Sequence, residues 1–169
     1  SESCFRIVDS GGTFIIKPRN PTYIELPENE DLTMRLAGIC GIEIPFHGLM
    51  YSKDDSLTYF IKRFDRINKN KKISIEDFAQ LSQNRRDTKY DYSMEKVADL
   101  LEKYCTFPAL EKIKLFRLTI FSFLVGNEDM HLKNFSMINR NQKIELSPAY
   151  DLLNTTIALK NPKEELPRR

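Results

Sequence analysis

The spacing of apolar residues changes near residue 65, from short alternating runs to helical periodicity. Cys4–Val8 and Thr13–Lys17 are β-rich runs joined by the Gly-containing stretch 9–12, which predicts a hairpin. Two further strands are predicted over residues 42–50 and 56–63. These runs together predict a small, mainly antiparallel sheet.

One helix is predicted between these two pairs of strands. Asn29 is its expected N-cap and Gly41 its expected stop. Glu30 and Asp31 suit the first turn, where acidic side chains interact favourably with the helix dipole. The predicted apolar face of this helix comprises Leu32, Leu36, Ile39 and Cys40.

Helical patterns dominate the remainder of the chain. A short helix is predicted over residues 75–83, and a second over Ser93–Tyr104 with Ser93 as N-cap. Ala109–Val125 begins amphipathic and ends apolar on all sides, so its second half is predicted to be buried. Phe135–Ile138 and Lys143–Leu146 are predicted to form a hairpin.

The element order predicts an α+β fold of two lobes. Residues 1–65 would form a sheet lobe with one helix, and residues 66–169 a mostly helical lobe. A ligand is expected in the cleft between the lobes. The chain opens on a strand-like run and stops soon after Asp151, so we expect both lobes to be incomplete at the chain ends.

Composition narrows the class of protein. The 169 residues are 41% hydrophobic and 30% charged, which is typical of a globular chain. A net charge of +2 gives no argument for direct nucleic-acid binding, and the longest apolar run, Leu118–Val125, is too short to span a membrane. Cys4, Cys40 and Cys105 lie far apart, which favours free thiols and a cytoplasmic location.

The strongest chemical signal is the polar stretch Asn127–Phe135, which directly follows the apolar helix. Asp129 and Asn134 have the D-x-x-x-x-N spacing of a kinase catalytic loop, in which the Asp accepts a hydroxyl proton and the Asn holds magnesium. Asp151 would supply a second metal-binding carboxylate. The alternative is an ordinary polar turn that ends a helix.

Phosphoryl transfer also needs a cation on the nucleotide phosphates. Lys17 ends an apolar strand and is the candidate, with Glu30 or Glu28 as the acid that fixes it; a solvated lysine is the alternative. His131 would orient the loop, and Lys133 is either a phosphate contact or exposed.

A single metal held by Asp129, His131 and Asp151 is a further possibility. Carboxylate and amide oxygens beside a nucleotide nevertheless suit magnesium better.

Several of these stretches closely resemble those of the HipA-like toxin kinases. The most specific parts are D-x-H-x-K-N and P-x-Y-D. The matching stretches are Phe14–Pro18, Asn29–Glu30, Ile61–Arg66, Glu76–Gln80, Lys89–Tyr90, Asp129–Ser136 and Leu146–Leu153.

The resemblance implies a role for each matching residue. Asp129 would be the catalytic base, Asn134 and Asp151 would hold Mg²⁺, and Lys17 would contact the ATP phosphates. The remaining residues would form the hinge and shape the nucleotide site: Lys62, Arg63 and Phe64 at the hinge, Asp65 near the ribose, and Glu30, His131, Lys133 and Tyr150 around the nucleotide.

The resemblance also implies substrates and partners. Family members phosphorylate a serine or threonine of a protein, typically an aminoacyl-tRNA synthetase, and so halt translation. A small DNA-binding antitoxin commonly neutralises them, and in the compact type the N-terminal extension is a separate small protein. The family's phosphate-covering loop with its autophosphorylated serine has no match here. A lipid or small-molecule kinase and an inactive kinase-fold binding module are the alternative functions.

Overall fold

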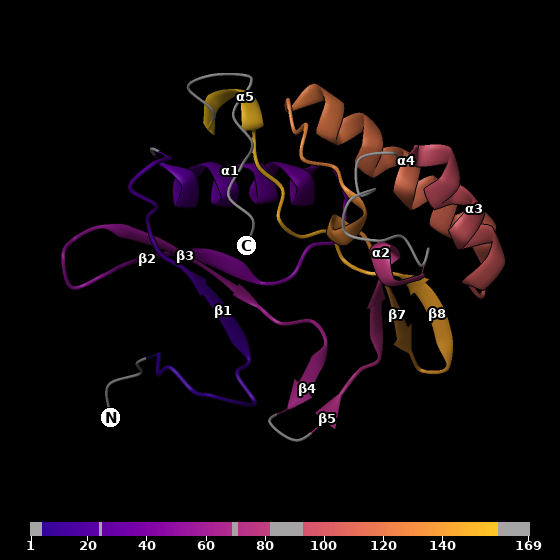
Figure 1. Cartoon of the computed structure of the whole chain (residues 1–169), viewed down its shortest axis with the longest axis horizontal. Coiled ribbons are helices and arrows are strands. Elements are labelled where there is room, and N and C mark those ends of the chain that lie inside the picture. The colour runs from indigo at the N-terminus through magenta and orange to yellow at the C-terminus, as the bar shows by residue number, and fades with distance from the viewer. Residues whose placement is uncertain (1–4, 24, 69–70, 82–92, 159–169) are drawn as a thin grey trace.

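The computed structural model describes residues 5–23, 25–68, 71–81 and 93–158. It shows an α+β fold with antiparallel sheets and helices, as predicted (Figure 1). The division into two lobes at residue 65 stays a prediction. Among the described residues, no helix is long and apolar enough to cross a membrane.

The first sheet consists of β1 (Phe14–Lys17), β2 (His47–Tyr51) and β3 (Leu57–Lys62) in the order β1-β3-β2. Both strand pairs are antiparallel, and Lys17 lies opposite Tyr59. Because side chains alternate between the faces of a sheet, this register puts Lys17 and Tyr59 on the same face. Helix α1 packs against β2 and β3.

Helix α1 (Leu26–Ile39) begins three residues before the predicted cap at Asn29. Pro27 lies in its first turn, where a proline is well tolerated because the N–H groups there have no helical partner. The predicted apolar face was wrong, since Leu32, Leu36 and Ile39 are exposed. The buried side chains are Leu26, Pro27, Glu30, Asp31, Thr33, Met34 and Ala37.

The second part of the molecule contains more strand than its periodicity indicated. A two-stranded ladder pairs β4 with β5, and a three-stranded sheet has the order β6-β7-β8. Helices α3 and α4 pack on each other and against β8 (Figure 1). The elements are β4 (Arg66–Asn68), β5 (Lys71–Lys72), β6 (Ile75–Asp77), α2 (Phe78–Leu81), α3 (Met94–Tyr104), α4 (Pro108–Leu124), the 3-10 turn η2 (Leu132–Asn134), β7 (Ser136–Arg140), β8 (Lys143–Leu146) and α5 (Thr155–Ala158).

Two of the predicted elements in this part are confirmed. Ser93 is the N-cap of α3 and accepts a hydrogen bond from the Lys96 N–H (3.5 Å), and the hairpin appears as β7 and β8. The predicted helix over 75–83 was wrong at its start, because residues 75–77 pair with β7 as β6; residues 82–83 lie outside the described part.

Two further predictions fail at the edges of the fold. Residues 5–8 form no strand, and residue 4 lies outside the described part. The end of α4 is not buried on all sides, since Phe123 and Leu124 are 84% and 74% exposed. The buried residues of α4 are Glu111, Leu115, Leu118, Phe121 and Ser122, whose spacing puts them on one side of the helix.

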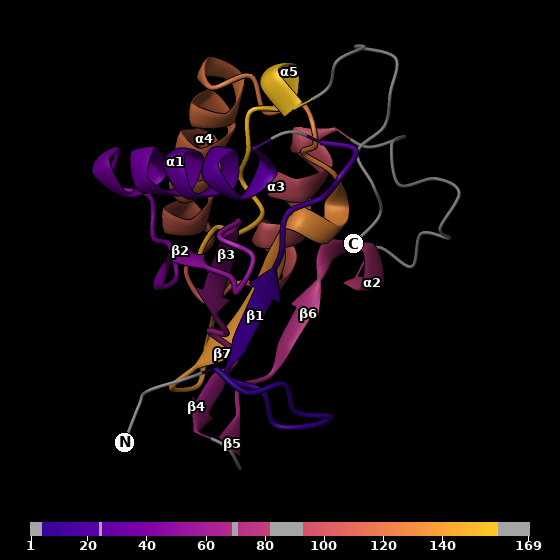
Figure 2. The same ribbon diagram turned by 90° about the vertical axis from the view of Figure 1, so that its left-hand side faces the viewer.

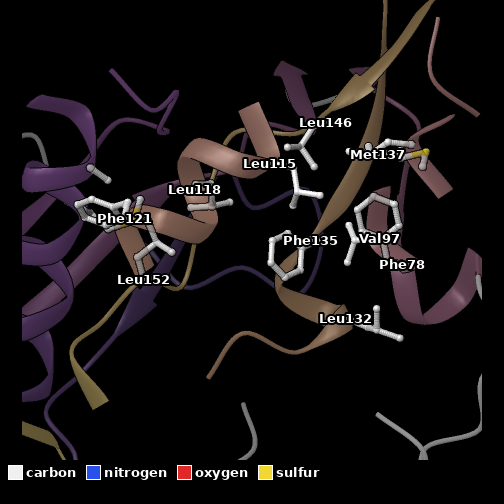
Figure 3. Packing of buried hydrophobic residues seen from close by; sticks show 14 of the residues in the cluster. Phe78, Val97, Leu115, Leu118, Phe121, Leu132, Phe135, Met137, Leu146 and Leu152 are labelled. Carbon is white, nitrogen blue, oxygen red and sulfur yellow. The ribbon is translucent and has the colours of Figure 1, made fainter. Parts of the chain in front are cut away.

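One hydrophobic cluster joins the sheet that carries β1 to the helices. Met34 of α1 and Tyr59 of β3 belong to the same cluster as Leu101 of α3, Leu118 of α4 and Met137 of β7. Figure 3 shows Leu118 and Phe121 of α4 close to Leu152, with Phe135 on the other side of Leu118. In the view of Figure 2, α1 crosses in front of α4, and the Arg117 guanidinium of α4 donates to the Gly41 carbonyl just after α1 (3.1 Å).

A buried polar contact fixes α1 on β2. His47 Nδ1 lies 3.0 Å from Asp31 Oδ1, and the Arg35 Nε donates to the other oxygen of Asp31 (2.6 Å). The His47 ring also packs against Tyr59, with 5.7 Å between the ring centres. Burial lowers the pKa of His47 below its ordinary value of 6.5, although Asp31 acts in the opposite direction.

This pKa shift predicts a specific loss of stability in weak acid. A folded-state pKa below the unfolded value means that the unfolded chain binds more protons near pH 6, so stability is complete above about pH 6.5 and falls as pH drops below it. We expect the free energy of unfolding of His47→Gln to depend less on pH between 7.5 and 5.5 than that of the wild type. Urea denaturation at several pH values measures this, and an equal or steeper slope in the variant would contradict it.

Candidate active site

Lys17 lies between two carboxylates that come from distant parts of the chain. Its ammonium donates to Glu30 Oε1 (2.5 Å) and to Asp151 Oδ1. Glu30 is fully buried, and it, rather than Glu28, is the partner of Lys17. The Lys17 ammonium also lies 5.6 Å from the centre of the Tyr59 ring, a favourable distance for a cation–π contact. Strand β1, helix α1 and the segment after β8 thus converge on one ammonium group.

Asp151 has an unusual backbone conformation. Its φ of 54° lies in the left-handed region, which Asp adopts more readily than most residues. Backbone outliers of this kind cluster at functional sites, where surrounding contacts hold them in place. Residues on both sides of Asp151 are held in this way, since Ala149 N–H donates to Glu43 O (2.8 Å) and Asn154 N–H to Asn29 Oδ1 (2.8 Å).

The predicted catalytic loop begins where α4 ends, just beyond Gly126 with its φ of 66°. Its shape is fixed by internal hydrogen bonds. The Asp129 N–H donates to Asn127 Oδ1 (3.2 Å), and the Asn134 amide donates to the Asp129 carbonyl (2.5 Å). His131 Nε2 lies 3.6 Å from Asp129 Oδ1. The sequence spacing of five therefore brings the two ends of the loop together.

The donor atoms here suit magnesium. Because the Asn134 NH₂ group points at the Asp129 carbonyl, its Oδ1 is turned elsewhere and accepts no hydrogen bond from the described residues. This oxygen and the carboxylate of Asp151 are hard ligands of the kind that Mg²⁺ prefers. The alternative site from Asp129, His131 and Asp151 is not assembled, since the described residues contain no cluster of three His, Cys, Asp or Glu that could hold a metal.

Several groups of the predicted hinge, residues 62–65, already make hydrogen bonds within the protein. The Lys62 N–H donates to Phe46 O and the Arg63 N–H to Thr13 O (both 2.8 Å), so neither group is open to an adenine ring. Two hydrogen bonds from Arg63 hold the Asp65 carboxylate (2.9 and 2.7 Å) and keep its pKa below the usual range. The ring of Phe64 packs against that of Tyr150, with 5.6 Å between centres.

Tyr150 uses its hydroxyl inside the protein. The hydroxyl donates to the Lys133 carbonyl (2.8 Å) and lies 2.6 Å from Ser136 Oγ. Burial raises the pKa of Tyr150 well above its ordinary value. The structure therefore links Tyr150 to the loop through the backbone of Lys133, whose side chain is exposed.

A known protein family matches almost the whole chain. Residues 5–167 match the model of the HipA-like C-terminal domain. The chain belongs to this family.

Two curated relatives of the HipA-like domain extend the match. A Sinorhizobium fredii protein named "Putative kinase Y4dM" is 35% identical over 158 residues, covering 86% of this chain and 38% of the relative. A Haemophilus influenzae protein named "Putative kinase" is 29% identical over 164 residues, covering 90% of this chain and 48% of the relative. The chain thus spans less than half the length of these relatives.

Two solved structures resemble the HipA-like domain. Shewanella oneidensis HipA, solved with HipB and operator DNA, superposes with a TM-score of 0.72 at 27% identity, covering 85% of this chain and 38% of HipA. The Helicobacter pylori proinflammatory kinase CtkA superposes with a TM-score of 0.65 at 15% identity, covering 82% and 49%, which shows a shared fold.

Sequence reasoning missed several contacts that hold this HipA-like site. Asn29 was interpreted as a helix cap, yet its side chain bonds to the backbone of Asn154. Thr155 and Asn127 were assigned no role, although both are buried and bond to the predicted loop. Polar residues at these positions carry no local signal, because their partners are brought close only by the tertiary fold.

The hydrogen bonds of Tyr150 give a prediction for stability. We expect Tyr150→Phe to lower the free energy of unfolding by about 1–2 kcal/mol, because the Lys133 carbonyl and the Ser136 hydroxyl each lose a partner. The matched control is Tyr51→Phe, at a ring that is 75% exposed, where a change within about 0.5 kcal/mol is expected. Equal effects in urea denaturation would show that the Tyr150 hydroxyl is not a structural contact.

Proposed function

We propose that this HipA-like domain carries the ATP- and magnesium-dependent phosphotransfer site of a serine/threonine protein kinase that acts as the toxin of a toxin–antitoxin system. The observation that carries the proposal is the pair of Lys17 with the buried Glu30 (2.5 Å), in the same molecule as an Asp129–Asn134 loop of kinase spacing. In protein kinases a strand lysine paired with a helix glutamate, together with such a loop, makes up the transfer site.

Lys17 would bind the ATP phosphates, and Glu30 would hold its ammonium in place. Glu30 is fully buried, so its charge favours a nearby cation strongly and limits where Lys17 can lie. Asn134 and Asp151 would hold magnesium, which neutralises charge on the phosphates. Lys62, Arg63, Phe64 and Asp65 would line the adenine and ribose through groups other than the Lys62 and Arg63 N–H, which are bonded inside the protein.

Asp129 would act on the acceptor. Its carboxylate accepts the proton of a substrate hydroxyl while the hydroxyl oxygen bonds to the γ-phosphorus and the bond to the β-phosphate oxygen breaks. The hydrogen bonds from Asn134 and to Asn127 fix the backbone of Asp129, and His131 lies beside its carboxylate. The loop therefore needs little rearrangement to present a base.

The proposed substrate is an aminoacyl-tRNA synthetase, and the proposed partners are a small DNA-binding antitoxin and a separate small protein resembling the N-terminal extension. Shewanella HipA, solved with HipB and operator DNA, supports the antitoxin. A lipid or small-molecule kinase is the second candidate for the same phosphotransfer chemistry. An inactive binding module is less well supported, because Lys17, Glu30, Asp129, Asn134 and Asp151 are all present.

Phosphotransfer is tested with radiolabelled ATP, the full-length protein and a cell extract. We expect label on a protein band, abolished by EDTA and reduced at least about 100-fold in Asp129→Asn, because a positioned general base contributes roughly 10²–10⁴-fold. The control is Asp99→Asn at an exposed position of α3, with unchanged labelling expected.

The distribution of label separates the candidate functions. Label confined to the lipid fraction would favour the lipid kinase. Absence of transfer and of ATP binding would favour the inactive module, and equal labelling by Asp129→Asn and the wild type would show that Asp129 is not the base.

A further inference from the structure

The segment that follows Asp151 is bonded to helix α1 through two hydrogen bonds. The Asn29 amide donates to the Asn154 carbonyl (2.9 Å), and the Asn154 N–H donates to Asn29 Oδ1 (2.8 Å). One side chain thus satisfies both backbone groups of a residue 125 positions away. Asn29 directly precedes Glu30, and Asn154 lies three residues after Asp151, so this contact joins the elements that carry the two partners of Lys17.

The same segment is bonded to the start of the predicted catalytic loop. Thr155 is 2% exposed. Its hydroxyl donates to the Gly126 carbonyl (2.8 Å) and accepts from the Glu128 N–H (3.0 Å). Its own N–H donates to the same Gly126 carbonyl (3.0 Å). Glu128 directly precedes Asp129, so these bonds fix the backbone that leads into the proposed base.

We propose that Asn29 and Thr155 are positioning residues, and that Asn154 and Thr155 form a two-sided clamp that holds helix α1 and the catalytic loop at one fixed separation. The proposal rests on the proposed function, because the clamp matters through the groups it places: Glu30 with Lys17 on one side and Asp129 on the other. Errors of about 1 Å in such placement are costly for transfer.

The bonding pattern favours a positioning role over ordinary helix capping. Asn29 lies inside α1, where its side chain satisfies no helix terminus. Two of the three side-chain hydrogen bonds that it makes with described residues are to backbone groups of another segment, and the third is a longer bond from the Thr33 hydroxyl to Asn29 Oδ1 (3.3 Å). The side chain that does cap a helix is that of Asn154, whose Oδ1 accepts from the Ile157 N–H in the first turn of α5 (3.0 Å). The Asn29 and Thr155 hydrogen bonds bury no apolar surface, so their contribution is to fix the relative position of the segments they join.

The first test replaces Asn29 in the full-length protein and compares steady-state phosphotransfer. Asn29→Leu keeps a similar size and removes both hydrogen bonds to Asn154, together with the longer one from the Thr33 hydroxyl (3.3 Å). We expect kcat to fall about tenfold or more, with KM for ATP changed less than about threefold. A kcat within twofold of the wild type would overturn the proposal. A loss confined to KM would also overturn it, because it would make Asn29 a contributor to nucleotide binding alone.

Asn29→Asp supplies a conservative variant that can recover one bond. An ionised carboxylate cannot donate to the Asn154 carbonyl, whereas a protonated one can. Its charged neighbours in the chain are Glu28 and Glu30; Lys17 pairs with Glu30 and with Asp151, which lies three residues before Asn154. We expect the ratio of Asn29→Asp activity to wild-type activity to rise as pH is lowered from 8.5 to 5.5. The same ratio for Asn29→Leu should not change with pH. Parallel ratios in the two variants would overturn the proposal. Asn139→Asp, an exposed site, is the matched control.

Adjacent threonines test the other side of the clamp. We expect Thr155→Val to lower kcat about tenfold with little change in KM, and Thr156→Val, at an exposed side chain, to leave both unchanged. If the two sides form one unit, the double variant Asn29→Leu/Thr155→Val loses less than the product of the single effects. Full independence of the two effects would overturn the two-sided clamp.

Amide hydrogen exchange gives a readout that does not depend on transfer. Asn29→Leu is expected to speed exchange at the start of α1 and over residues 152–158 at least about threefold, while α3 is unchanged. If wild-type protein transfers no phosphate but exchange changes in this way, the proposed function fails and the clamp stands as a contact. If transfer is normal and exchange at both segments is unaffected, the clamp fails and the function stands.

Discussion

The charge of the buried Glu30 is the constraint on which the site depends. A carboxylate without solvent costs several kcal/mol unless a cation lies next to it, and Lys17 is that cation. The requirement is met by three features together: the register of β1, the rotation of α1, and the position of the ammonium beside Asp151. It also explains why α1 turns Leu32 and Leu36 outward. The face with Leu32 and Leu36 has the stronger hydrophobic pattern, yet the helix buries the face that carries Glu30, Met34 and Ala37.

That inversion shows where sequence reasoning stops. Elements whose signals are local were predicted well: Ser93 caps α3, and the hairpin of β7 and β8 follows from its turn. The rotation of α1 was not predicted, because periodicity counts a glutamate as a surface residue and cannot see a lysine on another strand. Residues 75–77 were assigned to a helix for a similar reason. Their strand conformation comes from pairing with β7, about sixty residues later in the chain.

The candidate site divides in the same way. Asp129, Asn134 and Asp151 were found because their spacing and neighbours are a recognisable pattern, and the structure joins the first two through a hydrogen bond. Lys17 and Glu30 were selected on weaker grounds, and the structure brings them together. Tyr150 was grouped with the nucleotide-binding residues, whereas its hydroxyl bonds to Lys133 and Ser136. The motif selected the candidate residues, and only the structure shows what each one touches.

The residues that pattern reasoning missed explain how separate motifs become one site. No covalent or sequence proximity links α1 to the segment after β8. The Lys17 ion pairs join them at a single point, and Leu26 of α1 belongs to one buried apolar cluster with Leu153 and Ala158. A lysine side chain is long and flexible, so one ammonium between two carboxylates constrains their separation loosely. Two short hydrogen bonds between the Asn29 carboxamide and a backbone unit constrain both distance and orientation. Short polar side chains bonded to the backbone therefore fix the relative position of the two segments more precisely than the charged groups do. The difference follows from side-chain length, because a shorter side chain has fewer rotatable bonds.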